Sequence, residues 1–397
     1  MKSNWTTTTI DDVCSLVTDG AHNSPKSVEK GYYMASVKDF TEYGFDFSSC
    51  RKISEEDYEK LRKQGCVPQK DDVLVGKDGA RYFEDIVIYR QDEQPALLSS
   101  IAILRANCKK ITPEFLYYTL KTPAIKKDVR DNYGSGSAIP RIVLKDFKRM
   151  PFSYPDIDEQ RKITAVCSVI DEKIQVNNAI NKNLLEQMQA LYKAWFVDFE
   201  PFGGVRPSNW NDTNIYAIAN IIYGAPFASK LFNTDGLGKP IIRIRDLKEQ
   251  SFVTFTTEEH PKGHLIQPGD IVVGMDGEFR PYIWGNEPAW LNQRVCIFEN
   301  NRPQGKAFVL YTIKPLLNKI EQTQVATTVI HIGKKDFDAF EIVLPDEATL
   351  DNFDSITAPM LEQIVNNRLQ NKRLAVLRDT LLPKLMSGEL DVSDIDL

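Results

Sequence analysis

Apolar residues between positions 156 and 199 recur at alternating steps of four and three, which is the 3.5-residue period of a coiled-coil seam. The seam positions are Ile163, Cys167, Ile170, Ile174, Asn177, Asn181, Leu184, Met188, Leu191 and Trp195. Asp156 and Glu159 have the spacing of a capping box at a helix start, and Pro201 with two following glycines marks a stop. The pattern predicts one helix over 158–199, which at about 1.5 Å per residue spans roughly 60 Å.

A second seam with the same spacing follows Pro345 and Asp346. Its positions are Phe353, Thr357, Met360, Ile364, Asn367, Asn371, Leu374, Arg378 and Leu381. Pro383 lies near the end of this pattern, and proline ends or kinks a helix. We therefore expect the second long helix to be shorter than the first.

Asparagine occupies two seam positions in each helix, at Asn177 and Asn181 and again at Asn367 and Asn371. A buried seam asparagine costs stability but fixes the register, because a slip leaves it without a partner. If Asn177 faces Asn371 and Asn181 faces Asn367, the neighbouring seam positions pair apolar with apolar. The sequence thus predicts an antiparallel pair of helices. The alternative is two surface helices whose asparagines face water.

The regions before the two helices repeat each other. "GAHNSPK" (20–26) returns as "GAPFASK" (224–230), and "DVLVGKDG" (72–79) returns as "DIVVGMDG" (270–277). The order of the matches is preserved and the offset shrinks slightly, so the second copy carries small deletions. A single repeat with a period of about 200 residues excludes a solenoid and indicates a duplicated module.

This layout predicts four segments: a first module (1–155), a first long helix (156–205), a second module (206–345) and a second long helix (346–397). Short β-branched runs such as "DVLVG", "IAILRA", "PIIRIRDL", "DIVVG" and "RVCIF" predict strands, while "EFLYYTLKT" and "AFVLYTIKPLL" predict helices. The predicted fold is mixed α/β (α+β), with two pseudo-twofold related modules separated by two long antiparallel coiled-coil helices. The Gly-x-Asp-Gly phrases are expected to be structural turns.

Composition narrows the class of protein. Hydrophobic residues make up 42% and charged residues 26% of the chain, as in ordinary globular domains. The formal net charge is −6, and the acidic excess lies mainly in the two helical segments, so each module can carry a basic face. Six cysteines without a C-x-x-C pair, and an N-terminus without an apolar core, predict a cytoplasmic protein. No stretch is long and apolar enough to predict a membrane span.

Motifs for catalysis are missing. "VGKDG" lacks the spacing of a P-loop, and the chain has neither the G-x-S-x-G nor the methyltransferase N-P-P-[FY] pattern. Asp156 and Asp171 imitate a nuclease motif, but in one helix they lie about 22 Å apart, too far to share a metal. The four histidines form no metal-ligand set and are expected in surface loops. We therefore predict a binding protein with no catalytic residues, no metal site and no cofactor of its own.

The first long helix resembles the first central helix of the specificity (S) subunits of type I restriction-modification systems. Pro155, Glu159-Gln160-Arg161-Lys162-Ile163 and Trp195-Phe196-Val197-Asp198-Phe199 carry this resemblance. The ending "LRDTLLPKLMSGEL" (377–390) resembles the C-terminal helix of that family, and Asn292-Gln293 before a predicted strand also agrees. The second helix departs from the pattern, because no Gln-Arg follows Glu347.

The resemblance implies that each module is a target recognition domain that binds one half of a split, asymmetric sequence in double-stranded DNA. It also implies that the helices set the spacer, hold the two modules about one DNA turn (~34–36 Å) apart and dock two methyltransferase (M) subunits. Restriction/translocase (R) subunits would join the same complex. The complex would use S-adenosylmethionine, ATP and Mg, none of them bound by this chain.

Candidate DNA contacts are the basic residues near the repeated turns, because arginine pairs with guanine and lysine more often meets phosphate. They are Lys26, Lys77, Arg81, Arg141, Lys230, Arg243, Arg245 and Arg280, with Arg243 and Arg245 on a presumed strand. The rival hypothesis is a pseudo-symmetric adaptor for two protein partners with no role in DNA binding. Salt-dependent affinity for duplex DNA separates the two hypotheses.

Overall fold

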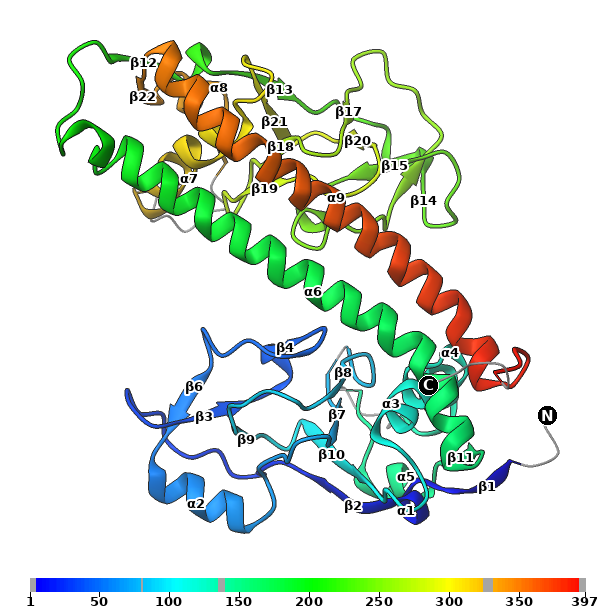
Figure 1. The fold of residues 1–397 in the computed structure, drawn as a ribbon. Coiled ribbons are helices and arrows are strands. Elements are labelled where there is room, and N and C mark those ends of the chain that lie inside the picture. The colour runs from blue at the N-terminus through cyan, green and yellow to red at the C-terminus, as the bar shows by residue number, and fades with distance from the viewer. Residues whose placement is uncertain (1–4, 80, 135–139, 324–330, 393–397) are drawn as a thin grey trace. The chain divides into compact units, whose positions relative to one another are not determined.

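The computed structural model describes residues 5–79, 81–134, 140–323 and 331–392, and the chain forms two compact units (Figure 1). Unit 1 contains Met1–Gln175 and Leu374–Leu397, and unit 2 contains Val176–Arg373. The two long helices, α6 (Ile157–Phe196) and α9 (Glu347–Met386), each contribute a part to both units. Each unit therefore combines one module with portions of both helices.

The main sheet of unit 1 is antiparallel, with the strand order β2-β10-β7-β8. These strands are β2 (Cys14–Asp19), β10 (Ile101–Ala106), β7 (Val73–Gly76) and β8 (Ile86–Ile88). The other strands are β1 (Thr6–Thr9), β3 (Tyr32–Ala35), β4 (Phe40–Thr41), β5 (Gly44–Phe45), β6 (Arg51–Ile53), β9 (Ala96–Leu97) and β11 (Pro151–Tyr154). The helices before α6 are α1 (Ile10–Val13), η1 (Val37–Asp39), α2 (Glu55–Lys63), α3 (Pro113–Lys121), α4 (Pro123–Asn132) and α5 (Leu144–Arg149).

Strand β7 is buried along its whole length because both faces of the main sheet are covered. Val73 and Val75 point into a core that contains Phe115 of α3, whereas Leu74 points into a second core with Leu97 of β9. Alternate residues of a strand face opposite sides, so the apolar run "VLV" supplies both cores. This packing fixes the end of β7, after which the chain turns at the repeated Gly-x-Asp-Gly phrase.

Unit 2 repeats this topology, with a main sheet of order β13-β21-β18-β19. These strands are β13 (Ala219–Tyr223), β21 (Val295–Asn300), β18 (Ile271–Gly274) and β19 (Pro281–Ile283). The other strands are β12 (Asn211–Asn214), β14 (Phe232–Asn233), β15 (Lys239–Ile242), β16 (Phe255–Thr256), β17 (Leu265–Ile266), β20 (Ala289–Leu291) and β22 (Glu341–Leu344). The helices are η2 (Glu200–Phe202), η3 (Ile215–Ala217), η4 (Ser229–Leu231), η5 (Ile244–Asp246), α7 (Lys306–Thr323) and α8 (Lys334–Asp338). The predicted mixed α/β fold with a duplicated module is confirmed.

Helices α6 and α9 begin in the same way. The carboxylate of Asp156 accepts a hydrogen bond from the Glu159 backbone N–H (2.9 Å), and Asp346 accepts one from Thr349 (3.1 Å). These bonds satisfy N–H groups that lack partners in the first helical turn.

The expectation that the second helix is shorter is wrong, because α6 and α9 are each 40 residues long. α9 continues past Pro383 to Met386, and the Ser387 backbone N–H still bonds the Pro383 carbonyl (2.9 Å). Leu382 and Leu385 are buried in a core of unit 1, and this burial holds the last turn in place despite the proline.

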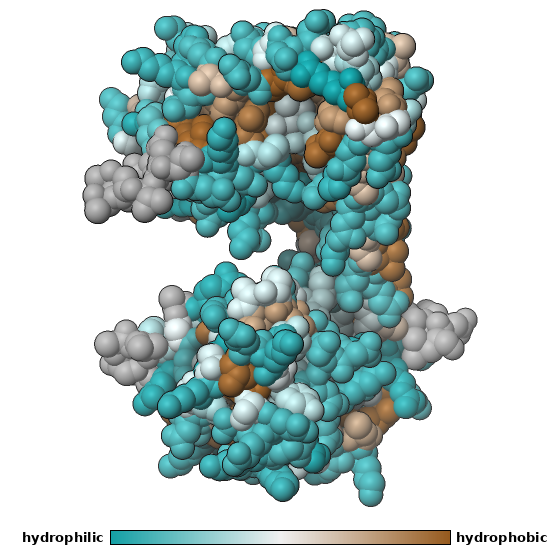
Figure 2. Space-filling model, turned by 90° about the vertical axis from the view of Figure 1, so that its left-hand side faces the viewer, coloured by the Kyte–Doolittle hydropathy of each residue, from teal (hydrophilic) through white to brown (hydrophobic). Residues whose placement is uncertain are grey.

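One face of the molecule is mostly polar (Figure 2). Hydrophilic residues cover most of the face drawn in Figure 2, with small apolar groups between them. Within the described ranges, no helix is long and apolar enough to cross a membrane. Five of the six free cysteines are buried, and Cys108 is exposed.

Candidate nucleic-acid interface

The turn after the central strand of each module has the same structure. Gly79 and Gly277 have positive φ angles of 96° and 78°, which L side chains rarely adopt. Asp78 forms an isolated antiparallel bridge with Arg141, and Asp276 forms the equivalent bridge with His331. The Gly-x-Asp-Gly phrases are thus turns, and each turn is tied to a segment from the end of its module.

In module 1 this turn carries a cluster of charges. Lys77 Nζ lies 3.3 Å from Asp19 Oδ2 and 3.6 Å from Asp78 Oδ1, and His22 Nε2 lies 3.2 Å from Asp19 Oδ1. Lys77 is buried, so its ammonium group neutralises Asp19 inside the module. Arg141 is exposed on the other side of the bridge.

Module 2 has different residues at the same turn. Met275 takes the position of Lys77 and is buried. His331 Nδ1 lies 2.6 Å from Asp276 Oδ1, and Arg294 Nη1 lies 2.9 Å from the His331 ring nitrogens. The two modules therefore present different hydrogen-bonding groups from the same scaffold. The sequence predicted only that His331 lies in a surface loop. The repeat aligns His331 with Arg141, and this alignment is the signal that could have identified His331 as the equivalent residue of module 2.

The glycine of each "GA" phrase lies against the backbone at the end of a neighbouring strand, β9 in module 1 and β20 in module 2. A Cβ atom at Gly20 would lie 2.3 Å from the Leu97 carbonyl oxygen, and one at Gly224 would lie 1.9 Å from the Asn292 carbonyl oxygen. Only glycine permits this approach. Lys26 follows Gly20 and Lys230 follows Gly224, and both lysines are exposed.

The remaining predicted DNA contacts lie near these loops in sequence but already have acidic partners. Arg81 pairs with Asp85 (2.7 Å), and Arg280 bonds Asn318 (3.0 Å) and Glu321.

The prediction that Arg243 and Arg245 lie on a strand is wrong. β15 ends at Ile242, Arg243 caps the short helix η5, and Arg245 lies within η5. Asp246 explains the change, because its side chain accepts the Arg243 backbone N–H (3.1 Å) and ends the extended conformation. Arg245 remains 68% exposed.

The seam asparagines pair across the helices within unit 2. Asn177 Nδ2 donates to Asn371 Oδ1 (2.8 Å), and Asn367 Nδ2 donates to Asn181 Oδ1 (2.9 Å). These are the two partnerships expected from the antiparallel register. Asn177, Asn181 and Asn367 are buried, whereas Asn371 is partly exposed.

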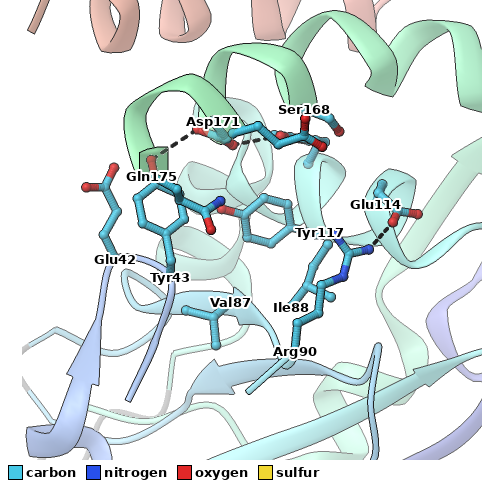
Figure 3. Close-up of a pocket in the computed structure, with 12 residues that line it drawn as sticks. Glu42, Tyr43, Val87, Ile88, Arg90, Glu114, Tyr117, Ser168, Asp171 and Gln175 are labelled. Atoms are coloured by element: carbon cyan, nitrogen blue, oxygen red, sulfur yellow. Dashed lines mark hydrogen bonds and ion pairs between the residues drawn. The ribbon is translucent and has the colours of Figure 1, made fainter. Parts of the chain in front are cut away.

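Unit 1 contains a second polar cluster, beside a cavity of about 160 Å³ (Figure 3). Asp171 of α6 accepts hydrogen bonds from Tyr118 (2.7 Å) and Tyr43 (3.3 Å) and pairs with Arg378 of α9 (2.5 Å). Burial, and then the negative charge of Asp171, raise the pKa of Tyr43 and Tyr118, so both remain hydroxyl donors.

The charge of Arg378 is secure despite its burial. Burial alone lowers the pKa of Arg378, but hydrogen bonds to Asp379 and Asp171 and the charge of Asp171 outweigh this and raise it. The seam pattern includes Arg378, whereas Asp171 was considered only as part of a nuclease motif and rejected. Their partnership was missed because only the folded chain brings them together.

A family model described as "Type I restriction modification DNA specificity domain" matches residues 2–186 and 207–378, which include both modules. The chain belongs to this family. The match confirms the resemblance found in the first long helix.

Two curated relatives of this specificity protein illustrate the family. The MjaIX specificity subunit of Methanocaldococcus jannaschii is 26% identical over 72% of this chain and 71% of its own length. The HindI specificity subunit of Haemophilus influenzae is 22% identical over 72% of this chain and 80% of its own length. The crystal structure of an S subunit from M. genitalium has the same fold, with a TM-score of 0.55, 17% identity and 97% coverage of both chains.

Gln160, in the Glu-Gln-Arg-Lys-Ile run that resembles the family, has a structural role in this specificity protein. Gln160 is fully buried, and its Nε2 donates to the carbonyls of Lys110 and Pro155 (both 2.9 Å). Its Oε1 accepts the Thr112 backbone N–H (2.9 Å). Gln160 thus connects module 1 to the first turn of α6.

Proposed function

We propose that this chain is the DNA-specificity subunit of a type I restriction-modification complex and that each module binds one half of a split, asymmetric site in double-stranded DNA. The observation that carries the proposal is the family match across both copies of the module. Two copies of one scaffold with different side chains at the same turn suit a protein that binds two different half-sites.

The proposed DNA-contacting groups are the exposed donors around the repeated turns. In module 1 they are Lys26 and Arg141, and in module 2 they are Lys230, Arg245 and His331. Arginine can pair with both acceptors of a guanine edge, while lysine meets phosphate without reading sequence. The other four candidates already form ion pairs, and we propose that they either fix the loops or exchange a carboxylate partner for a DNA phosphate. These residues are Lys77, Arg81, Arg243 and Arg280.

The helices are proposed to set the spacer between half-sites and to dock two methyltransferase (M) subunits, with restriction (R) subunits joining the assembly. Exposed apolar side chains support a docking role for α6, because Val169 (65% exposed), Val176 (52%) and Ile180 (40%) recur at the spacing of one helical face. The complex would take S-adenosylmethionine, ATP and Mg on its other subunits, and this chain would supply no catalytic group.

The test is a genome-wide map of methylated adenines in cells that carry this chain with its neighbouring methyltransferase, compared with cells that lack only this chain. We expect one split motif with a fixed spacer to disappear. An Arg141→Ala variant should alter one half-site and leave the other unchanged, with Arg62→Ala, an exposed residue of α2, as the matched control. An unchanged map in cells whose methyltransferase is active would reject the proposal.

The spacer hypothesis has its own test. A heptad inserted within residues 177–188, with a matching heptad inserted between Met360 and Asn371, should lengthen the spacer in the methylated motif and keep both half-sites. An unaltered spacer in a folded variant would show that the helix length does not set the spacer. A protein adaptor with no DNA role has no phosphate contacts, so it would lack the salt-dependent affinity for duplex DNA that a specificity subunit shows.

A further inference from the structure

The buried pair formed by Asp171 and Arg378 is a charged contact between the two long helices inside unit 1. Both side chains are at most 8% exposed, and their charged atoms are 2.5 Å apart. Tyr118 satisfies the second carboxylate oxygen, and Arg378 Nε donates to Asp379 (2.9 Å). A buried pair with this many partners becomes strongly unfavourable when either charge is removed alone.

The repeat places an apolar pair at the equivalent positions of unit 2. Aligning the capping residues Asp156 and Asp346, and the seam asparagines, puts Leu361 at the position of Asp171 and Met188 at the position of Arg378. Leu361 and Met188 are buried in one core of unit 2. Both members of the pair therefore change together, from charged in unit 1 to apolar in unit 2.

This double exchange matters because the two helices have similar seams. Through the same asparagine layers, α6 has the pattern to pair antiparallel with a second copy of α6, and α9 with a second copy of α9. In the first arrangement Asp171 would face Met188, and in the second Arg378 would face Leu361. In the first arrangement Asp171 is buried without a counter-charge, and in the second Arg378 loses its buried partner and keeps only its exposed neighbour Asp379. Pairing α6 with α9 instead matches charge with charge and apolar with apolar.

We propose that Asp171, Arg378, Leu361 and Met188 form a pairing code by which the α6 seam accepts α9 and rejects a second copy of α6. Rejection comes from the unpaired buried charge, which weakens a mismatched contact roughly 100-fold or more per charge. The code keeps one module of each kind in every subunit. If each module binds one half-site, as in the proposed function, the code also keeps the DNA site asymmetric.

The experiment starts from the complete folded chain with a protease site inserted in the exposed loop between Gly203 and Arg206. Cutting this loop leaves an α6 half and an α9 half, held together by the helix pair and by the packing of each helix end on the other half's module. The cut protein is incubated in mild urea so that the halves exchange, and native mass spectrometry then counts the mixed and the same-half complexes. The assay contains no DNA and no methyltransferase, so its outcome is independent of the proposed function.

In the wild-type protein we expect mixed complexes, with same-half complexes at or below about 1%. The double variant Asp171→Leu with Arg378→Met copies the apolar pair of unit 2 and should approach the statistical 1:2:1 distribution. The single variant Asp171→Leu should raise α6-half pairs at least tenfold, and Glu172→Leu, an exposed acidic neighbour, should behave as wild type. Any of three results would overturn the code. They are statistical pairing in the wild type, a folded double variant that forms only mixed complexes, and equal effects of Glu172→Leu and Asp171→Leu.

Discussion

Replacing Gln160 with leucine tests the connection between module 1 and α6. The change keeps a side chain of similar size but leaves the Lys110 and Pro155 carbonyls and the Thr112 N–H without their partner. Each lost hydrogen bond contributes about 0.5–1.5 kcal/mol. The bond to Pro155 is buried, and those to Lys110 and Thr112 are partly buried. We expect the free energy of unfolding of unit 1 to fall by about 3 kcal/mol.

The assay is equilibrium unfolding in urea, read separately for each unit by hydrogen exchange and mass spectrometry, because a protein of two units need not unfold in one step. With a urea dependence of about 2 kcal/mol/M, the unfolding midpoint of peptides from α3 should fall by about 1.5 M. Peptides from the core of unit 2 should shift much less. Arg161→Leu, at an exposed neighbouring position, is the control and should stay within about 0.5 kcal/mol of wild type.

A second substitution makes the reasoning refutable. Gln160→Glu keeps an acceptor for Thr112 but turns a carboxylate toward two carbonyl oxygens, so it should be at least as destabilising as Gln160→Leu. The explanation fails if Gln160→Leu matches the Arg161→Leu control, or if Gln160→Glu is the milder change.

Three further outcomes are expected. Asn367→Leu alone should lower the unfolding free energy by about 1–3 kcal/mol because Asn181 loses its buried partner, whereas Asn181→Leu with Asn367→Leu should recover most of that loss in urea unfolding. Phe353→Ala removes a fully buried ring that contacts four other aromatic rings and should cost unit 2 about 3–5 kcal/mol in the same assay. The Thr349 backbone N–H lowers the pKa of Asp346, so its ionised form stabilises the fold above its usual pKa, and this stabilisation is lost as the pH falls through the lowered value. Asp346→Asn should therefore show a smaller loss of stability than wild type below about pH 4, measured by unfolding at a series of pH values.

The sequence predicted the features that depend on local period and on repetition. The seam spacing located both long helices, and the paired asparagines predicted the partners that Asn177 and Asn367 have in the structure. The repeat predicted two modules of equal topology. Two errors had different causes. A local side-chain bond from Asp246 ends β15 before Arg243, and packing of leucines against a core formed by a distant part of the chain carries α9 beyond Pro383.

The candidate site was less accessible to prediction. Basic residues near a turn predict exposure only on average, and Lys77 is instead neutralised by Asp19 inside the module. Gln160 was noticed as part of a family pattern, but two of its three backbone partners, Lys110 and Thr112, are far from it in sequence. The Asp171–Arg378 pair could have been predicted from the repeat. In the other copy Leu361 and Met188 replace both residues, and a comparison of equivalent helix positions shows this joint exchange.

The division of the chain into units has a consequence for synthesis on the ribosome. The core of unit 1 needs Leu382, Leu385 and Val392, and its buried carboxylate needs Arg378. Roughly 200 residues lie between Gln175 and Leu374, so translation at 5–20 residues per second takes roughly 10–40 s to deliver the missing part. The module that is made first is thus the last to be completed. A chain released before its final helix leaves this module open, with Asp171 awaiting its partner.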